Sequence, residues 1–316
     1  MISLHKTFLT FDVEDFINPY SLKALETVLN LLKRHRLNAL FFITGHMAEK
    51  ISNFPNIIEM LKTHEIGYHS SSHSVRHAIF EYTDIPRYKE AYEISLKRET
   101  SHINPLTGEI EGSGGIVLLK ELFPTKQIIA YRAPGCCWSA PHLDALRELG
   151  IQFDFSSKIS LAPFYYKGIT FYPFPTLGDW GGSRTEFLIA LRSILTREYS
   201  IIDVHPNHLV HENMWDHIYY NGNPERLYQA TPRNPTDIKS LFNSFELLLR
   251  QLRALKNCKL IEITSNLTKP KKGTKEEIDF KKVYGSSVFW AKRYFNYEPK
   301  FLYDHFSKFF DLSVAR

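Results

Sequence analysis

Residues 7–45 read TFLTFDVEDFINPYSLKALETVLNLLKRHRLNALFFITG, and this stretch decides the fold class. Its first apolar run, Phe8–Phe11, ends in acidic residues and predicts a strand. Apolar residues at helical spacing then predict a helix that Ser21 caps and that extends to about Arg34. A second apolar run, Ala39–Ile43, predicts another strand. This succession of strand, helix and strand indicates a parallel sheet covered by helices.

The alternation of strands and helices continues along the chain. Further strands are predicted at residues 65–68, 127–131, 151–155, 169–173, 200–204 and 260–264. Further helices are predicted at residues 57–63, 88–98, 141–149 and 236–255. The glycines and the proline within residues 101–118 indicate an inserted loop. So many strand–helix units favour a closed (β/α) barrel over an open sheet, and we therefore expect an α/β barrel.

The composition limits the class of protein. The chain has 316 residues, of which 43% are hydrophobic and 23% charged, so it can form a core and is not disordered. A net charge of +5 is weak for this length, and we predict no nucleic-acid partner. We see no secretory leader and no apolar run long enough to span a membrane, which predicts a cytoplasmic location. The 14 histidines invite a search for metal and acid–base sites, whereas the three cysteines form no disulfide framework.

We divide the chain into two parts. Residues 1–268 hold the predicted barrel, and residues 269–316 form a charged linker followed by an aromatic helical extension. The linker reads KPKKGTKEEIDFKK at residues 269–282, and twelve aromatic residues lie within residues 280–310. This pattern is typical of helices that pack on a barrel, although lysines mixed with aromatic residues also fit a helix at a membrane surface.

One pair of histidines stands out because it directly follows a predicted strand. His69 and His73 are four residues apart, so on a helical turn both imidazoles would reach one ion. The acidic cluster at residues 12–15 ends the first strand, and two histidines with one carboxylate would leave a coordination position open for water. The spacing alone is weak evidence, because His73 and His77 repeat it, and the alternative is a pair of surface or capping histidines.

Two further polar residues lie at predicted strand ends. Arg132 follows the strand at 127–131 and could hold a carboxylate in bidentate geometry or form a structural salt bridge. His205 follows the strand at 200–204 and precedes Pro206. Paired with an acid such as Asp179, it could stay protonated and donate a proton, or it could be a core histidine.

Together these segments resemble the polysaccharide deacetylase family, also called the NodB-homology group or carbohydrate esterase family 4. The resemblance runs from about residue 7 to 265 and rests on five motifs in order, which are far more specific together than singly. The matching segments are Thr10–Asp15 (TFDVED), Glu65–His73 (EIGYHSSSH) preceded by Ala39–Gly45 (ALFFITG), Tyr131–Pro134 (YRAP), Asp179-Trp180 and Val204–Pro206 (VHP).

The resemblance implies a distorted (β/α) barrel, a divalent metal, expected to be Zn²⁺, and removal of an acetyl group from a sugar. It implies Asp12 as general base, His69 and His73 as metal ligands, and His205 as general acid. The other implied roles are held by Arg132, which would position Asp12, Asp179, which would tune His205, and Trp180, Pro134 and Gly135, which would line the substrate site.

The sequence departs from the family pattern in two places. Val13 stands where the commonest first motif has a second Asp, so the third metal ligand is Glu14 or Asp15. Strand alternation puts Asp12 and Glu14 on one side and favours Glu14, whereas an immediate turn of the chain would favour Asp15. Gly135 stands where the family often has an aromatic residue, which leaves its N–H free as an oxyanion donor but removes a wall of the subsite.

The predicted function is therefore a metal-dependent hydrolase that removes an acetyl group from an N-acetylated sugar or glycan precursor. The partner would be a carbohydrate, either lipid- or nucleotide-linked, and residues 280–310 could contact a membrane surface from the cytoplasmic side. Two alternatives stay open: a C–N hydrolase acting on a non-sugar amide, and a glycan-binding protein without activity.

Overall fold

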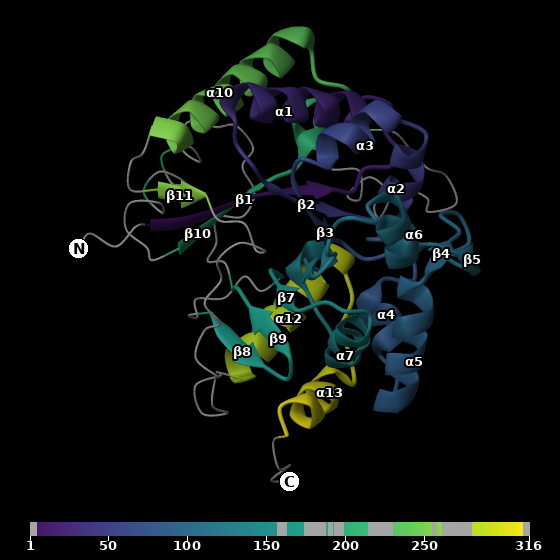
Figure 1. Ribbon diagram of the computed structural model, residues 1–316. Helices are drawn as coiled ribbons and strands as arrows, with labels where there is room; N and C mark the ends of the chain where they lie inside the picture. The colour runs from purple at the N-terminus through teal and green to yellow at the C-terminus, as the bar shows by residue number, and fades with distance from the viewer. Residues whose placement is uncertain are drawn as a thin grey trace.

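The structure is a computed structural model, and it describes residues 5–156, 163–173, 188, 192, 199–213, 230–254, 258–260 and 280–311. Its centre is one curled sheet, drawn in Figure 1. In spatial order the strands of this sheet are β10 (Tyr199–Val204), β1 (His5–Val13), β2 (Leu40–Ile43), β3 (Glu65–Tyr68), β6 (Ala130–Tyr131), β7 (Phe153–Asp154), β9 (Ile169–Phe171) and β8 (Phe164–Tyr166). β11 (Cys258–Leu260) pairs with the start of β1.

The neighbouring strands are parallel except for β8, which pairs with β9 in the antiparallel direction. Within the described chain, no pairing joins β8 to β10, so the sheet curls like a barrel without closing through these two strands. The fold class is therefore confirmed: an α/β protein with a distorted (β/α) barrel.

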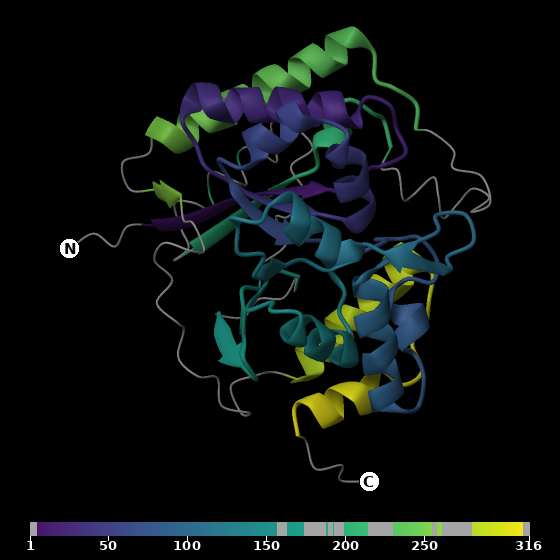
Figure 2. The same ribbon diagram turned by 45° about the vertical axis from the view of Figure 1, so that its right-hand side comes forward.

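Helices cover the outside of the sheet, and Figures 1 and 2 show α1 and α10 lying along one side of it. The helices are α1 (Ser21–His35), α2 (Gly45–Ser52), α3 (Pro55–Leu61), α4 (Ile79–Thr83), α5 (Tyr88–Glu99), α6 (Gly115–Leu122), α7 (Ala140–Glu148), α10 (Pro235–Ala254), α12 (Phe280–Phe295) and α13 (Leu302–Phe309). Two short 3₁₀ helices follow strands: η1 (Pro134–Cys136) follows β6, and η2 (Pro206–Leu209) follows β10.

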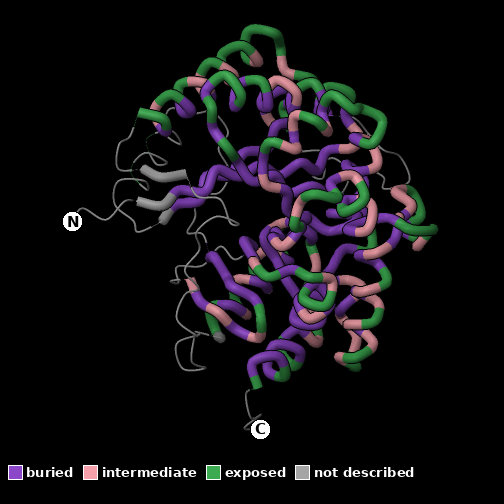
Figure 3. Tube along the Cα trace, viewed as in Figure 1, coloured by how far each residue is buried: buried purple, intermediate pink, exposed green. Residues whose placement is uncertain are grey.

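The core lies between the sheet and these helices, where Figure 3 shows buried strands and exposed outer helix faces. Phe11 of β1 stacks on Phe41 of β2 with ring centroids 4.7 Å apart. The leucines of α1 repeat at helical spacing, so one face of the helix, including Leu25 and Leu29, is buried against the sheet. This packing fixes the register of β1 and β2 and thereby sets where their carboxyl ends lie.

Three local predictions are wrong. The inserted loop at residues 101–118 contains a hairpin, β4 (Ser101–Ile103) with β5 (Ile110–Ser113), and the start of α6. The strand predicted at 127–131 is a strand only at Ala130–Tyr131. Ser21 is the first residue of α1 and no cap, because its hydroxyl donates to the Asp15 carboxylate instead.

The C-terminal helices pack on other elements of the fold: α12 contacts η1 and α13, and α13 contacts α7, beside which it lies in the lower part of Figure 1. Phe306 of α13 is fully buried and meets Trp138 edge to face at 4.9 Å, and Phe295 of α12 lies over η1. Residues 269–279 of the predicted linker lie outside the described residues, and its last three residues, 280–282, belong to α12. Of the helices that the structure describes, none combines the length and apolar character that a membrane crossing needs.

Candidate active site

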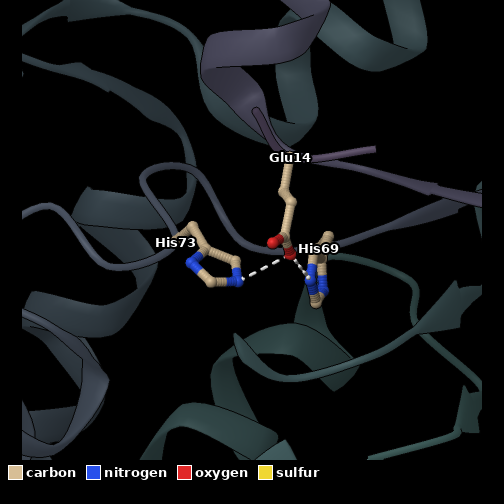
Figure 4. Close-up of side chains that lie close together, drawn as sticks. All are labelled: Glu14, His69 and His73. Carbon is tan, nitrogen blue, oxygen red and sulfur yellow. Dashed lines mark hydrogen bonds and ion pairs between the residues drawn. The ribbon is translucent and has the colours of Figure 1, made fainter. Parts of the chain in front are cut away.

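The carboxyl ends of β1 and β3 bring an acid and two histidines together. Glu14 follows β1 directly, His69 follows β3, and His73 lies four residues further on. One oxygen of Glu14, Oε2, lies 3.1 Å from His69 Nε2 and 2.9 Å from His73 Nε2, as Figure 4 shows. All three side chains are buried, and their ligand atoms lie within 4.8 Å of one another. Because β1 and β3 both flank β2 in parallel, their ends lie at the same edge of the sheet.

The segment from His69 to His73 is a loop, so the predicted helical turn is wrong although the two imidazoles do converge. Ser70 and His73 have positive φ angles of 66° and 47°. The loop is held from outside: the backbone N–H groups of Gly45 and His46 donate to the carbonyl oxygens of Ser70 and Ser71 at 3.0 and 3.2 Å. Long-range hydrogen bonds therefore replace the i to i−4 bonds that a helix would supply.

The orientation of His69 is fixed by a hydrogen bond between its Nδ1 and the carbonyl oxygen of Arg132, at 2.7 Å. A carbonyl oxygen can only accept, so Nδ1 carries a hydrogen, and Nε2 is the ring nitrogen that faces the Glu14 carboxylate. Histidines that bind metals are commonly oriented by such a bond to their second nitrogen. His73 Nδ1 contacts the hydroxyl of its neighbour Ser74 at 2.6 Å.

Arg132 lies beside this cluster and joins two acids. Its Nη1 donates to Asp12 Oδ1 at 2.7 Å and to Asp203 Oδ1 at 2.5 Å, and its Nη2 donates to the Thr10 hydroxyl at 3.0 Å. The guanidinium is fully buried and lies over the ring of Phe42, 4.5 Å from its centroid. This arrangement holds the Asp12 carboxylate in one orientation at the edge of the histidine cluster.

Asp203 was missed by the sequence-based prediction, although the sequence contains a signal for it. It is an acid inside the apolar strand β10, two residues before His205, so alternation puts both side chains on the same face. A buried charge needs a partner, and a cation at a neighbouring strand end, here Arg132, is the expected one.

The electrostatics of the cluster follow from these contacts. Burial alone would raise the pKa of Glu14, but the charges of His73 and His205 and the hydrogen bonds of His69 and His73 hold it well below its usual range. Burial would lower the pKa of His69, yet the neighbouring Asp12 and Glu14 carboxylates raise it. Burial likewise disfavours the Arg132 charge, and Asp12 and Asp203 raise its pKa. The site therefore keeps Glu14 ionised at neutral pH.

His205, at the end of β10, faces both acids. Its Nε2 lies 3.6 Å from Asp12 Oδ2 and 3.8 Å from Glu14 Oε2. The sequence-based mechanism expected Asp12 and His205 on opposite sides of an acetyl group, and no such group fits between atoms this close. That mechanism therefore requires the His205 ring to turn away from Asp12 when a substrate enters.

Asp15 lies apart from the cluster. Its carboxylate accepts from the backbone N–H of Asn18 at 3.0 Å, the Asn18 amide at 2.8 Å and the Ser21 hydroxyl at 2.5 Å. These bonds tie the acid to the start of α1, so of the two candidates for a third ligand only Glu14 lies with the histidines.

The remaining predicted substrate residues are placed only in part. Pro134 and Gly135 form η1 directly after Arg132 and Ala133, and Gly135 has a positive φ of 58°. A Cβ at Gly135 would lie 2.9 Å from the ring of Phe295, so α12 fills the space above this glycine. Asp179 and Trp180 lie outside the described residues.

The residues present fit a divalent cation. Two imidazole nitrogens and one carboxylate oxygen are the donor set that Zn²⁺ and related ions take in catalytic sites, where a further position stays open. A cation there would replace the short contacts between Glu14 and the imidazoles. Asp12 lies next to this set, with Oδ2 3.7 Å from His69 Nε2, and its other oxygen is held by Arg132.

Comparison with known proteins assigns the class. Residues 5–153 match the model of the polysaccharide deacetylase family. The resemblance read from the sequence motifs is thus confirmed, and the matched residues include the first three of the five motifs. A search of curated proteins found no match.

Solved structures show the same fold. A crystal structure named as a candidate polysaccharide deacetylase from Mycobacterium smegmatis superposes with a TM-score of 0.55 at 13% identity, covering 86% of this chain and 96% of that one. The 4-alpha-glucanotransferase from Thermococcus litoralis superposes with a TM-score of 0.51 at 13% identity, over 83% of this chain and 40% of that one. At such identity these similarities show the fold alone, because one fold hosts many activities.

Proposed function

We propose that this protein is a metal-dependent hydrolase that removes an acetyl group from an N-acetylated sugar or glycan precursor. The observation that carries the proposal is the convergence of His69 and His73 on one oxygen of Glu14, beside the Asp12–Arg132 pair. A polysaccharide deacetylase domain over residues 5–153 supports the same chemistry.

In this proposal Glu14, His69 and His73 hold a divalent cation, with Zn²⁺ as the expected ion. The bound cation would polarise the amide carbonyl and lower the pKa of a water molecule. Asp12 would accept the proton of the attacking water, and the hydrogen bond from Arg132 holds the carboxylate in position. His205 donates a proton to the leaving amine nitrogen after its ring turns away from Asp12. The backbone N–H of Gly135 is proposed as a donor to the developing oxyanion.

The substrate and the surroundings of the enzyme are finer parts of the proposal. The family favours a carbohydrate, and we propose a lipid- or nucleotide-linked sugar as the form that a cytoplasmic enzyme would meet. Contact with a membrane surface through residues 280–310 belongs to the same proposal, and three exposed aromatic residues support it: Phe289 and Tyr294 of α12 and Tyr303 of α13. The cytoplasmic location stays a prediction from the sequence.

The test is acetate release from N-acetylglucosamine oligomers before and after chelation, with Zn²⁺ returned at the end. We expect activity that chelation abolishes and Zn²⁺ restores. Asp12→Asn should lower kcat about 10²–10⁴-fold, because it removes the general base. Asp237→Asn on the exposed start of α10 is the matched control and should leave kcat unchanged.

Three outcomes would overturn the proposal or redirect it. Full activity without metal would exclude the chemistry. Hydrolysis of simple amides or formamides, with sugars untouched, would favour the non-sugar C–N hydrolase. Binding of glycans without acetate release would favour the alternative of a glycan-binding protein without enzymatic activity.

A further inference from the structure

A second cluster of metal-ligating side chains lies behind the loop that carries His69 and His73. It consists of His46 and Glu49, three residues apart on α2, and His102 on strand β4 of the hairpin. Each offers one ligand atom, and these atoms all lie within 4.8 Å of one another. Figures 1 and 2 show the hairpin and α2 on the same side of the molecule, with α6 beside them.

The hydrogen bonding of His46 leaves a free lone pair. Its Nε2 lies 2.6 Å from the carbonyl oxygen of Ile103, which can only accept, so this nitrogen carries the hydrogen of the ring. The other nitrogen, Nδ1, is buried and has no hydrogen-bond partner. A buried nitrogen without a partner costs free energy, and a carbonyl bond to the opposite nitrogen is the usual companion of a metal-bound histidine.

The side chains of Glu49 and His102 could supply the other two ligand atoms, and both have room to change conformation. Glu49 Oε1 and His102 Nδ1 lie 2.6 Å apart, and the two side chains are 30% and 29% exposed. In a tetrahedral site with bonds of about 2.0–2.1 Å, ligand atoms are about 3.4 Å apart. Because Glu49 and His102 are partly exposed, small side-chain rotations can move these two atoms apart to the spacing that an ion needs.

We propose that His46, Glu49 and His102 form a second cation site, of the Zn²⁺ type, that joins α2 to the β4–β5 hairpin. The two elements it would join are those that hold the catalytic loop. The backbone N–H of His46 donates to the backbone carbonyl of Ser71 at 3.2 Å. The Ser71 hydroxyl donates to the backbone carbonyl of Ser101 at 2.6 Å. The ion would therefore brace the loop between His69 and His73 from its outer side, without entering the site that faces substrate.

The test counts Zn²⁺ bound to untagged protein, after dialysis against metal-free buffer and titration with Zn²⁺ alone. Glu14→Gln removes the first proposed site, so any Zn²⁺ still bound reports on the second site alone. The result can therefore be interpreted even if the proposed deacetylase function is wrong. We expect this variant to bind one Zn²⁺, and the double variants Glu14→Gln/His102→Gln and Glu14→Gln/Glu49→Gln to bind none. Zn²⁺ should also raise the Tm of Glu14→Gln and leave that of the double variants unchanged.

His77→Gln in the Glu14→Gln background is the matched control, because His77 is exposed and lies in neither cluster. It should keep the single ion. Two results would overturn the proposal: a Glu14→Gln protein that binds no Zn²⁺, or an ion that stays bound in the His102→Gln and Glu49→Gln double variants. His102 and Glu49 are both partly exposed, so we expect both double variants to fold. If one of them does not fold, the Zn²⁺ count of the other tests the proposal.

Discussion

At the scale of single residues, Arg132 organises the centre of the site. A fully buried guanidinium is costly unless its donors are satisfied, and here it donates to Asp12, to Asp203 and to the Thr10 hydroxyl. Two carboxylates share one cation, so each limits the freedom of the other. Asp203 is thus a positioning residue for Asp12, acting through Arg132.

The role of Asp203 gives the first prediction. Asp203→Asn keeps the shape but removes one charge, so Arg132 is held less firmly and Asp12 loses its fixed orientation. We expect kcat for deacetylation to fall about 10–100-fold, which is the usual loss when a residue that orients a ligand or base through a hydrogen bond is replaced. The ion at Glu14, His69 and His73 should stay bound, which a count of metal per chain would check.

Asp154→Asn is the control for that prediction. Asp154 is also a buried acid at a neighbouring strand end, where burial raises its pKa to about 6, but its bonds go to Ser156 rather than to Arg132. Its substitution should leave kcat within about 3-fold. Equal losses of activity in both variants, or no loss in Asp203→Asn, would show that Asp203 does not position Asp12.

The sequence predicts much of the site at this scale because strand alternation is a local property. It put Asp12 and Glu14 on one side and favoured Glu14 over Asp15, and in the structure only Glu14 lies with the histidines. It could not predict where Asp203 lies, because the contact with Arg132 spans 71 residues and depends on the order of the strands.

At the scale of elements, the loop that carries the histidines is held by a buried acid at the end of α5. Glu99 accepts from the Ser71 N–H at 2.9 Å and from the hydroxyls of Tyr68 and Tyr82 at 2.5 and 3.2 Å. His142 of α7 contacts it at 2.9 Å. Burial would raise the pKa of Glu99, but the bonds and the charge of His142 lower it, so the acid is ionised inside the fold.

The second prediction concerns this network. Glu99→Gln removes a buried charge that four groups contact, leaving some donors without a partner. We expect the free energy of unfolding to fall by about 2–4 kcal/mol, measured by denaturant titration. Metal affinity at the histidine loop should fall with it.

Glu93→Gln on the same helix is the matched control. Glu93 is 59% exposed and pairs with Lys89, so the change should cost less than about 0.5 kcal/mol. A Glu99→Gln protein as stable as this control would contradict the account of the loop.

The wrong element predictions have a common physical cause. Four-residue spacing suggested a helical turn from His69 to His73, but bonds from Gly45, His46 and Glu99 hold the segment as a loop. The hairpin β4–β5 was read as a loop because its glycines and proline are also turn residues. Each outcome depends on partners distant in sequence.

At the scale of the whole molecule, the C-terminal helices are part of the packed structure. Phe306 is buried against Trp138, and Phe309 contacts the ring of Tyr166 at 5.6 Å. The alternation of strands and helices predicted the barrel, because this pattern recurs along the sequence and can be recognised without knowledge of tertiary contacts. The antiparallel strand β8 was not predicted, because its three residues are too few to show an alternating pattern, although aromatic residues favour strands.

The third prediction tests this packing. Phe306→Ala should lower the free energy of unfolding by about 3–5 kcal/mol, because it opens a cavity beside Trp138. Phe289→Ala is the same change at a side chain that is 54% exposed, and it should cost less than about 1 kcal/mol. Similar small effects in both variants would mean that α13 contributes little to stability.

The central claim is that one cation joins the ends of β1 and β3. The most direct measurement is anomalous X-ray scattering from crystals grown with Zn²⁺. We predict a peak about 2.0–2.2 Å from the Glu14 carboxylate and from Nε2 of both His69 and His73. A fully occupied ion held elsewhere, with no anomalous peak between these three side chains, would contradict the account.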